Sequence, residues 1–293
     1  GYENRQCELH QFRSRYHRDE VTNNRGGWAK LEFSKTEHLT SEGYFTYLKE
    51  FKGGHSLNAV AGYSYFEKNG ENFNAENYDF GVEGLKYWDL GAGSYLTDGK
   101  AAMGSGKNIT ERLFALYARA NYSYNDKYMV SATIRHEGSS KFAAENRWGN
   151  FWAASVAWVI SKEAFLENTE WIDMLKLKAS FGQQGNDALL RNGYANYYPY
   201  LGQYSMTGAN GIFSDGTLYY KGNPDITWEK SNSFNIGTDF TLLNHKLEGT
   251  IEYFNRKTSD MLYNKPVANS NGYSSIPMNI GSMTNSGVEI ELN

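Results

Sequence analysis

The stretch DMLKLKASFGQQGN, residues 173–186, alternates strictly between apolar and polar side chains. In an extended chain, Leu177 and Phe181 fall on one side, and Lys176 and Lys178 fall on the other. A period of two residues is typical of a β-strand with one apolar and one polar face. The apolar face must contact either a protein interior or lipid, and the rest of the chain indicates which.

The same alternation recurs along the chain and predicts about ten strands. Many of these segments exceed the about 5–6 residues of an ordinary soluble strand. They approach or pass the about 9–11 residues that a tilted membrane-spanning strand needs. The predicted strands are residues 28–35, 44–51, 55–67, 111–124, 127–135, 150–160, 173–186, 231–243, 245–255 and a last one ending at 293, with a doubtful one at 8–18.

The connections between these segments alternate in length. Residues 52–54, 125–126 and 244 leave room only for tight turns, whereas 68–109 and 186–227 are very long. Short turns on one side and long loops on the other are typical of outer-membrane β-barrels. Structureless loops of about 40 residues also argue against a compact soluble domain.

The composition agrees with a polar, aromatic-rich β-protein. Aromatic residues make up 16% of the 293 residues, with 30 glycines and only 4 prolines. A net charge of −4 gives no indication of nucleic-acid binding, and the single cysteine, Cys7, excludes an internal disulfide. There is no run of 18 apolar residues, so no transmembrane helix is predicted. The first residues, GYENRQCELH, suggest a chain cut from a longer one.

These observations predict an all-β fold, an antiparallel transmembrane β-barrel segment with long extracellular loops and short periplasmic turns. Trp152 and Trp158 lie near the two ends of one predicted strand, where amphipathic rings prefer the water–lipid interface. Leu175, Leu177 and Phe181 would then face lipid, and Lys176 and Lys178 would face a watery interior. A secreted soluble carbohydrate-binding β-protein remains the alternative, because a soluble sandwich also alternates.

Several stretches resemble one family in order and spacing. They are RHEGSSKFAAENRWGNFWAASVAWVISKEAF (135–165), LKLKASFGQQGN (175–186), NPDITWEKSNSFNIGTDF (223–240), IEYFNRKTSDML (251–262), NIGSMTNSGVEIELN (279–293) and, earlier, GGHSLNAVAGYSY (53–65). Together they resemble the barrel of the SusC/RagA family of TonB-linked outer-membrane proteins. The chain departs from that pattern at Glu137, where the family has Asp, and at Trp152, where it has Pro. Ala157 and Val159 stand near the family's Gly and Arg.

The resemblance implies part of a TonB-dependent nutrient importer in the cell outer membrane of a Gram-negative bacterium. Such a protein has a barrel of about 22 strands around an N-terminal plug. It takes up glycans, or peptides in some members, with energy from TonB and with a SusD-like surface lipoprotein as a lid. Residues 1–293 would be part of the barrel domain, with the plug domain and the C-terminal closing strands absent. The partners implied are outer-membrane lipid, the SusD-like lipoprotein, TonB through the plug, and an oligosaccharide or peptide substrate. A passive porin or structural outer-membrane barrel is the alternative.

Several motifs are weak as chemical sites. GSGKN (104–108) lacks the first glycine and the Ser/Thr of a phosphate loop, so a flexible loop is expected. The six histidines show no HExxH spacing, and Ser139–Ser140 has no nucleophile-elbow context. Glu289 and Glu291 share one strand face and are expected to line the interior. We therefore predict no enzyme activity, no cofactor and no metal site.

One loop is a candidate for ligand binding. Exposed aromatic rings can stack on sugars or pack on peptide side chains, but they can equally pack loop on loop or against a lid protein. The candidate residues are Tyr194, Tyr197, Tyr198, Tyr200 and Tyr204, with Trp148 in the neighbouring loop.

Overall fold

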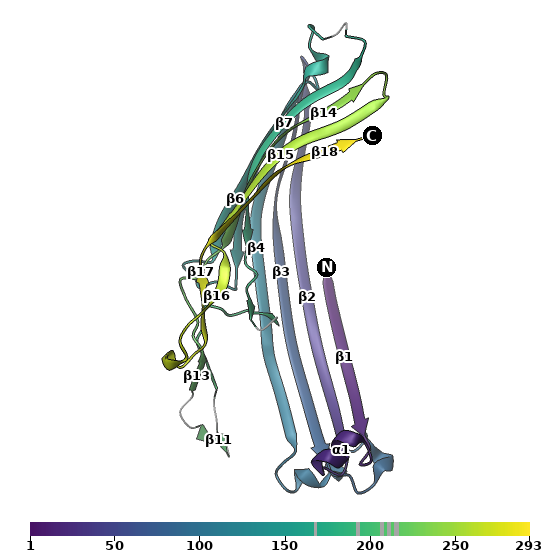
Figure 1. Cartoon of the computed structure of the whole chain (residues 1–293), viewed down its shortest axis with the longest axis vertical. Helices are drawn as coiled ribbons and strands as arrows, with labels where there is room; N and C mark the ends of the chain where they lie inside the picture. Colours follow the sequence, from purple (N-terminus) through teal and green to yellow (C-terminus); the bar gives the residue numbers. More distant parts are fainter. Residues whose placement is uncertain (167–168, 192–193, 206–207, 210–211, 214–216) are drawn as a thin grey trace. The chain divides into compact units, whose positions relative to one another are not determined.

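Ten strands form one sheet in the computed structural model, which describes residues 1–166, 169–191, 194–205, 208–209, 212–213 and 217–293. The strand order is β1-β2-β3-β4-β5-β6-β7-β14-β15-β18 (Figure 1). Their bounds are β1 Tyr2–Arg13, β2 Trp28–Phe51, β3 His55–Tyr78, β4 Ala102–Tyr124, β5 Tyr128–Ser139, β6 Trp148–Val159, β7 Ile172–Asn186, β14 Glu229–Leu242, β15 Leu247–Ser259 and β18 Ser282–Leu292. The predicted all-β fold and its about ten strands are confirmed.

The remaining elements are short and lie in the connections. Four two-stranded ladders pair β8 (Leu190–Arg191) with β9 (Tyr194–Ala195), β10 (Gln203–Ser205) with β13 (Thr217–Tyr220), β11 (Gly208–Ala209) with β12 (Ile212–Phe213), and β16 (Leu262–Pro266) with β17 (Ser275–Asn279). The helical pieces are α1 (Arg18–Asn23), η1 (Glu83–Leu85), η2 (Leu90–Ala92), η3 (Ser94–Leu96), η4 (Ile160–Lys162) and η5 (Asn269–Asn271). Within the described residues, no helix is both long and apolar enough to cross a membrane.

The chain divides into two compact units, which are described separately. The first holds Gly1–Ser41 and Phe66–Arg112, and the second holds Glu42–Tyr65 and Leu113–Asn293. Strands β2, β3 and β4 have residues in both units. Their parts in the second unit have about the 9–11 residues that a tilted strand needs to cross the hydrocarbon core.

In the second unit, short and long connections lie at opposite edges of the sheet. We call the edge with residues 52–54, 125–127, 160–171 and 243–246 the turn edge, and the edge with residues 140–147, 187–228 and 260–281 the loop edge. The turns need left-handed backbone, and Asn125, Asp126 and Asn244 all have positive φ. Asn and Asp adopt this conformation more readily than other side chains because they bond to the nearby backbone. The predicted alternation of tight turns and long connections is confirmed.

The two faces of the second unit's sheet differ in polarity as the alternation predicted. Leu177 is 43% exposed and Ile290 is 64% exposed, so no part of the chain that the structure describes covers this apolar face. One row across six strands on that face reads Tyr128, Trp158, Leu177, Thr238, Ile251 and Ile290. The neighbouring row on the opposite face reads Met129, Ala157, Lys178, Gly237, Glu252 and Glu289. An exposed apolar face beside a polar one suits lipid on one side and water on the other.

In the first unit the strands run further than the sequence suggested. The segments predicted as strands at 28–35 and 44–51 are both strand, but the break predicted between them is wrong, because β2 is continuous over Trp28–Phe51. Its middle, TEHLTSEG (36–43), has no apolar period, but β1 pairs with β2 from Tyr2 opposite Leu39 to Arg13 opposite Trp28, which includes residues 36–39. Backbone pairing with β1 therefore extends a strand whose side chains do not indicate it. The doubtful strand at 8–18 is β1, shifted toward the N-terminus.

The connection predicted over residues 68–109 is also much shorter in the structure. Strand β3 continues to Tyr78 and β4 begins at Ala102, so GSGKN lies in β4 and the expected flexible loop there is wrong. On β2, ion pairs join residues two apart on one strand face. Lys30 Nζ lies 2.6 Å from Glu32 Oε2, and Lys35 Nζ lies 2.8 Å from Glu37 Oε1. Charged side chains of this kind suit strands in water.

Candidate functional site

The polar face of the second unit carries a network of charged side chains. Lys178 Nζ lies 2.8 Å from Asp239 Oδ1 and 3.2 Å from Glu252 Oε2, and Lys176 Nζ lies 3.8 Å from Asp239 Oδ2. Charges spaced across three strands compensate each other on a face that also contacts water. Lys176 and Lys178 therefore lie on the face that the sequence predicted for them.

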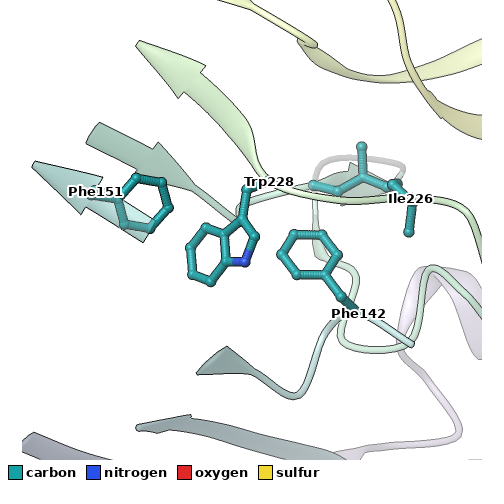
Figure 2. Close-up of a cluster of buried hydrophobic side chains, with 5 residues drawn as sticks. Phe142, Phe151, Ile226 and Trp228 are labelled. Atoms are coloured by element: carbon teal, nitrogen blue, oxygen red, sulfur yellow. The ribbon is translucent and has the colours of Figure 1, made fainter. Parts of the chain in front are cut away.

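At the loop edge, three connections pack around one buried apolar cluster. The cluster consists of Phe142, Phe151, Leu189, Ile226 and Trp228, and Figure 2 shows the two Phe rings on either side of the Trp228 indole. Phe142 and Phe151 each have ring centroids 5.3 Å from that of Trp228. The Trp228 Nε1 donates to the Arg147 carbonyl at 2.9 Å, so the buried indole is satisfied. This cluster joins residues of the 140–147 and 187–228 connections to β6.

Asparagine side chains tie the third connection to the same place. Asn279 Nδ2 donates to the carbonyls of Thr227 and Asp260, both at 2.8 Å, and its Oδ1 accepts from the Thr227 backbone N–H at 2.8 Å. Asn223 Nδ2 donates to the Pro277 carbonyl at 2.9 Å. These bonds replace the ladder hydrogen bonds that the loop backbone lacks.

A buried polar contact links the end of β5 to the start of the 187–228 connection. Ser139 is fully buried, and its hydroxyl donates to Asp187 Oδ2 at 2.6 Å. Lys141 Nζ, also buried, donates to Asp187 Oδ1 at 3.2 Å. One carboxylate therefore accepts from both groups. Ser139 and Lys141 of the SSK stretch (139–141) thus anchor the start of the 187–228 connection.

Of the predicted ligand residues, Trp148 lies elsewhere than expected. It is the first residue of β6, so its predicted place in a loop is wrong. Its ring stacks on His136, with centroids 4.7 Å apart and planes 1° from parallel, and meets the edge of Phe114. Phe114, Gly138 and Trp148 are cross-strand partners on the apolar face. Any ligand contact of Trp148 stays a prediction.

The tyrosines lie where the sequence placed them, in the 187–228 connection. Tyr200 is half-buried and packs against the apolar cluster, as the loop-on-loop alternative expected. Tyr197 and Tyr198 are partly exposed. Tyr194 and Tyr204 lie in the short strands β9 and β10, and their side chains fall outside the described residues.

Sequence reasoning assigned no role to the side chains that hold the loop edge together. Asn223, Thr227 and Asn279 lie in stretches that indicate the family but no contact of their own. No local pattern marks them, because their partners lie far away in sequence. Among the described residues, there is no group of three His, Cys, Asp or Glu side chains placed to hold a metal ion.

Comparison with known proteins identifies the fold. A family model described as "TonB dependent receptor-like, beta-barrel" matches residues 3–293. The chain belongs to this family of TonB-dependent receptor barrels. The TonB-dependent receptor P3 of Formosa agariphila is 32% identical over 271 residues, which are 92% of this chain and 26% of that receptor.

Two further relatives place the chain within the TonB-dependent receptors. The receptor SusC of Bacteroides thetaiotaomicron is 31% identical over 188 residues, covering 62% of this chain and 18% of SusC. A solved structure of the RagAB peptide importer, in its closed-closed state, covers 99% of this chain and 31% of its own, with a TM-score of 0.83 and 23% identity. The resemblance to the SusC/RagA family is therefore confirmed. The chain spans about a quarter of the length of TonB-dependent receptor P3.

Proposed function

We propose that this chain forms part of the wall of a TonB-dependent importer in the outer membrane of a Gram-negative bacterium. Its apolar face contacts lipid, and its polar face lines the lumen. The observation that carries the proposal is the family match over residues 3–293 together with a sheet whose apolar face is uncovered. The transport cycle requires a plug domain that contacts TonB, which belongs to the parent protein.

The substrate we propose is a glycan, with a SusD-like lipoprotein closing the loop side. The relationship to SusC supports this choice. The similarity to the structure of the RagAB peptide importer makes peptides the alternative substrate class. Tyr197 and Tyr198 are partly exposed, and we expect them to contact the substrate. Tyr200 instead packs against the apolar cluster beneath the loop.

The decisive test uses the full-length parent gene in its own host. Deleting the TonB-contacting segment of the plug should abolish uptake of labelled oligosaccharides or peptides while the barrel still reaches the outer membrane. A passive porin, the alternative function, would keep transporting without TonB. Competition between unlabelled glycans and unlabelled peptides for that uptake then decides the substrate class.

The tyrosine loop has its own test in the same system. Replacing Tyr197 and Tyr198 together by Ala should weaken substrate binding, because exposed aromatic anchors often carry roughly 2 kcal/mol or more each. If those tyrosines contact the lid instead, the double variant would lose the co-purifying lipoprotein and keep its substrate affinity. Tyr200→Ala is the matched comparison. Because Tyr200 packs against the apolar cluster, this variant should loosen the loop edge and weaken both substrate binding and co-purification of the lipoprotein.

A further inference from the structure

One row across the polar face has arginines at both ends and small residues between them. Strand pairing places Arg119, Thr133, Ala153, Gly182, Ser233 and Arg256 opposite one another, from β4 to β15. Neighbouring strands lie about 4.7–4.9 Å apart, so the two arginine positions are about 24 Å apart along the sheet. We call this row the arginine trough.

The arginines of the trough differ from the other cations of this face. Arg135 forms two hydrogen bonds with the Glu137 carboxylate, at 2.9 and 2.7 Å, and Lys178 is held by Asp239 and Glu252. Arg119 is exposed and, among the described residues, has no carboxylate or hydrogen-bond partner. Arg256 Nε donates only to the Ser233 hydroxyl, at 3.2 Å, within the described chain. The trough therefore presents uncompensated positive charge.

The space beside Arg119 is a hollow lined by hydroxyl groups. It has a volume of about 340 Å³. Arg119 lies in its wall, with the hydroxyls of Ser131, Thr133, Ser155, Ser180 and Ser233. Its floor is open because the residues there are small: a β-carbon added at Gly182 would lie only 3.1 Å from the Ala153 Cβ. Larger side chains in this row would fill the space that a ligand needs.

We propose that the arginine trough binds carboxylate groups of an extended acidic ligand. A guanidinium presents N–H donors in a planar fork that matches a carboxylate, and neighbouring hydroxyls can donate to the same oxygens. A small ion reaches only one arginine, whereas an extended ligand contacts both ends of the row. The inference rests on the proposed function, which makes this face the lining of the lumen.

Two sources supply such carboxylates. One is a run of Asp or Glu side chains on the domain that occupies the lumen in the parent protein. The other is the substrate, as an oligosaccharide built of uronic acids. Purified full-length receptor distinguishes them without TonB or an energised membrane, so failure of TonB-dependent uptake would leave this experiment informative.

The first arm measures ligand binding by calorimetry. The probe is hexagalacturonate, an acidic oligosaccharide, with neutral maltohexaose as the comparison ligand. If the substrate is the source, Arg119→Gln weakens hexagalacturonate binding about tenfold or more, since hydrogen bonds to charged groups are the stronger ones. Arg119→Lys retains part of the affinity, and added salt weakens the wild-type interaction. Lys246→Gln, which removes an exposed cation at the turn edge, has no effect.

The second arm measures retention of the lumen domain. Urea that unfolds this domain opens the pore, and conductance in planar bilayers reports the urea midpoint. If the lumen domain is the source, Arg119→Gln lowers that midpoint while hexagalacturonate binding does not respond. Arg256→Gln repeats both arms from the other end of the trough, so a folding failure of one variant does not end the test. If Arg119→Gln and Arg256→Gln match wild type in both arms, the proposal is wrong.

Discussion

Trp228 at the loop edge and Trp158 at the turn edge of the same sheet both satisfy their indole N–H but have different surroundings. Trp228 is buried against Phe142 and Phe151 and donates to a backbone carbonyl. Trp158 is half-exposed, stacks on Tyr128 with planes 14° apart, and donates to Glu163 at 2.9 Å. One ring is enclosed by apolar protein side chains, whereas the other is half-exposed and contacts an aromatic neighbour and a carboxylate.

At the turn edge, aromatic rings follow one another across four strands. His55 stacks on Tyr124, Tyr124 on Tyr128, and Tyr128 on Trp158. Amphipathic rings with a polar atom at one end suit a boundary between lipid and water. The comparison indicates that the loop edge contains an apolar core of its own, whereas the turn edge has exposed rings that suit a boundary with lipid.

The largest effect is expected at the loop edge. Trp228→Ala removes the central ring of the cluster, and burial losses of this kind cost about 3–5 kcal/mol. Hydrogen exchange in the parent receptor should then show faster exchange in residues 187–191 and 223–228, with the strands unchanged. Trp158→Ala is the matched variant and should change exchange much less in lipid. Equal exchange in the two variants would contradict the comparison.

The next effect is expected between the two edges, on the apolar face. Leu177→Arg puts a charge on the lipid side of β7, which costs roughly 2–4 kcal/mol near the bilayer midplane. Ser180→Arg, on the polar face of the same strand, should cost far less because water reaches it. Folding of the parent barrel into lipid vesicles measures both, and similar losses would mean that the faces are assigned wrongly.

The sequence predicted the features that repeat along the chain. Alternation placed Leu177 and Lys178 on the correct faces, and tight turns such as 125–126 appeared as breaks between alternating segments. These signals are local, since each strand alternates by itself whatever its neighbour is. The strand predicted at 127–135 ends too early because His136 and Gly138 interrupt the apolar face, although β5 runs to Ser139.

The sequence could not predict contacts between distant segments. Residues 36–39 of β2 are mostly polar, and they form a strand because β1 pairs with them. Asn279 reaches Thr227, 52 positions earlier, and Trp148 joins β6, where it stacks on His136. The arginine trough likewise exists only once six strands are in register. The sequence predicted where the tyrosine loop of the candidate site lies. It did not predict that Tyr200 packs against the apolar cluster while Tyr197 stays partly exposed.

A smaller effect is expected when the polar ties of the loop edge are removed one at a time. Asn279→Ala removes three hydrogen bonds and leaves the Thr227 backbone N–H without its acceptor, which costs about 1–3 kcal/mol. Limited proteolysis of the parent receptor should show earlier cleavage in residues 260–281. Asn271→Ala, in the same connection, leaves the three hydrogen bonds of Asn279 intact and serves as the control. Cleavage that is unchanged in Asn279→Ala would mean that the apolar cluster alone holds the loops.

The smallest effect is expected at Glu163 on the turn edge, and it depends on pH. The Glu163 carboxylate accepts from the Tyr128 hydroxyl at 2.5 Å, from Trp158 Nε1 at 2.9 Å and from Lys127 Nζ at 3.1 Å. These bonds lower the pKa of Glu163 below its usual value near 4.5, the one from Tyr128 most. A depressed pKa stabilises the folded state fully above the usual pKa, and this contribution is lost as the pH falls through the folded value.

Glu163→Gln tests this directly, because the amide keeps an acceptor oxygen and loses the charge. In lipid vesicles at neutral pH, the variant of the parent receptor should pass from its folded to its heat-denatured gel band at a slightly lower temperature than wild type. The gap should shrink as the pH falls below about 4.5 and close once the pH passes the lowered folded pKa of Glu163, where wild type also loses the carboxylate. Glu170→Gln, in the same connection, controls for net charge. A gap that persists in acid would show that Glu163 acts through shape, and the turn edge would then resemble the loop edge more than we infer.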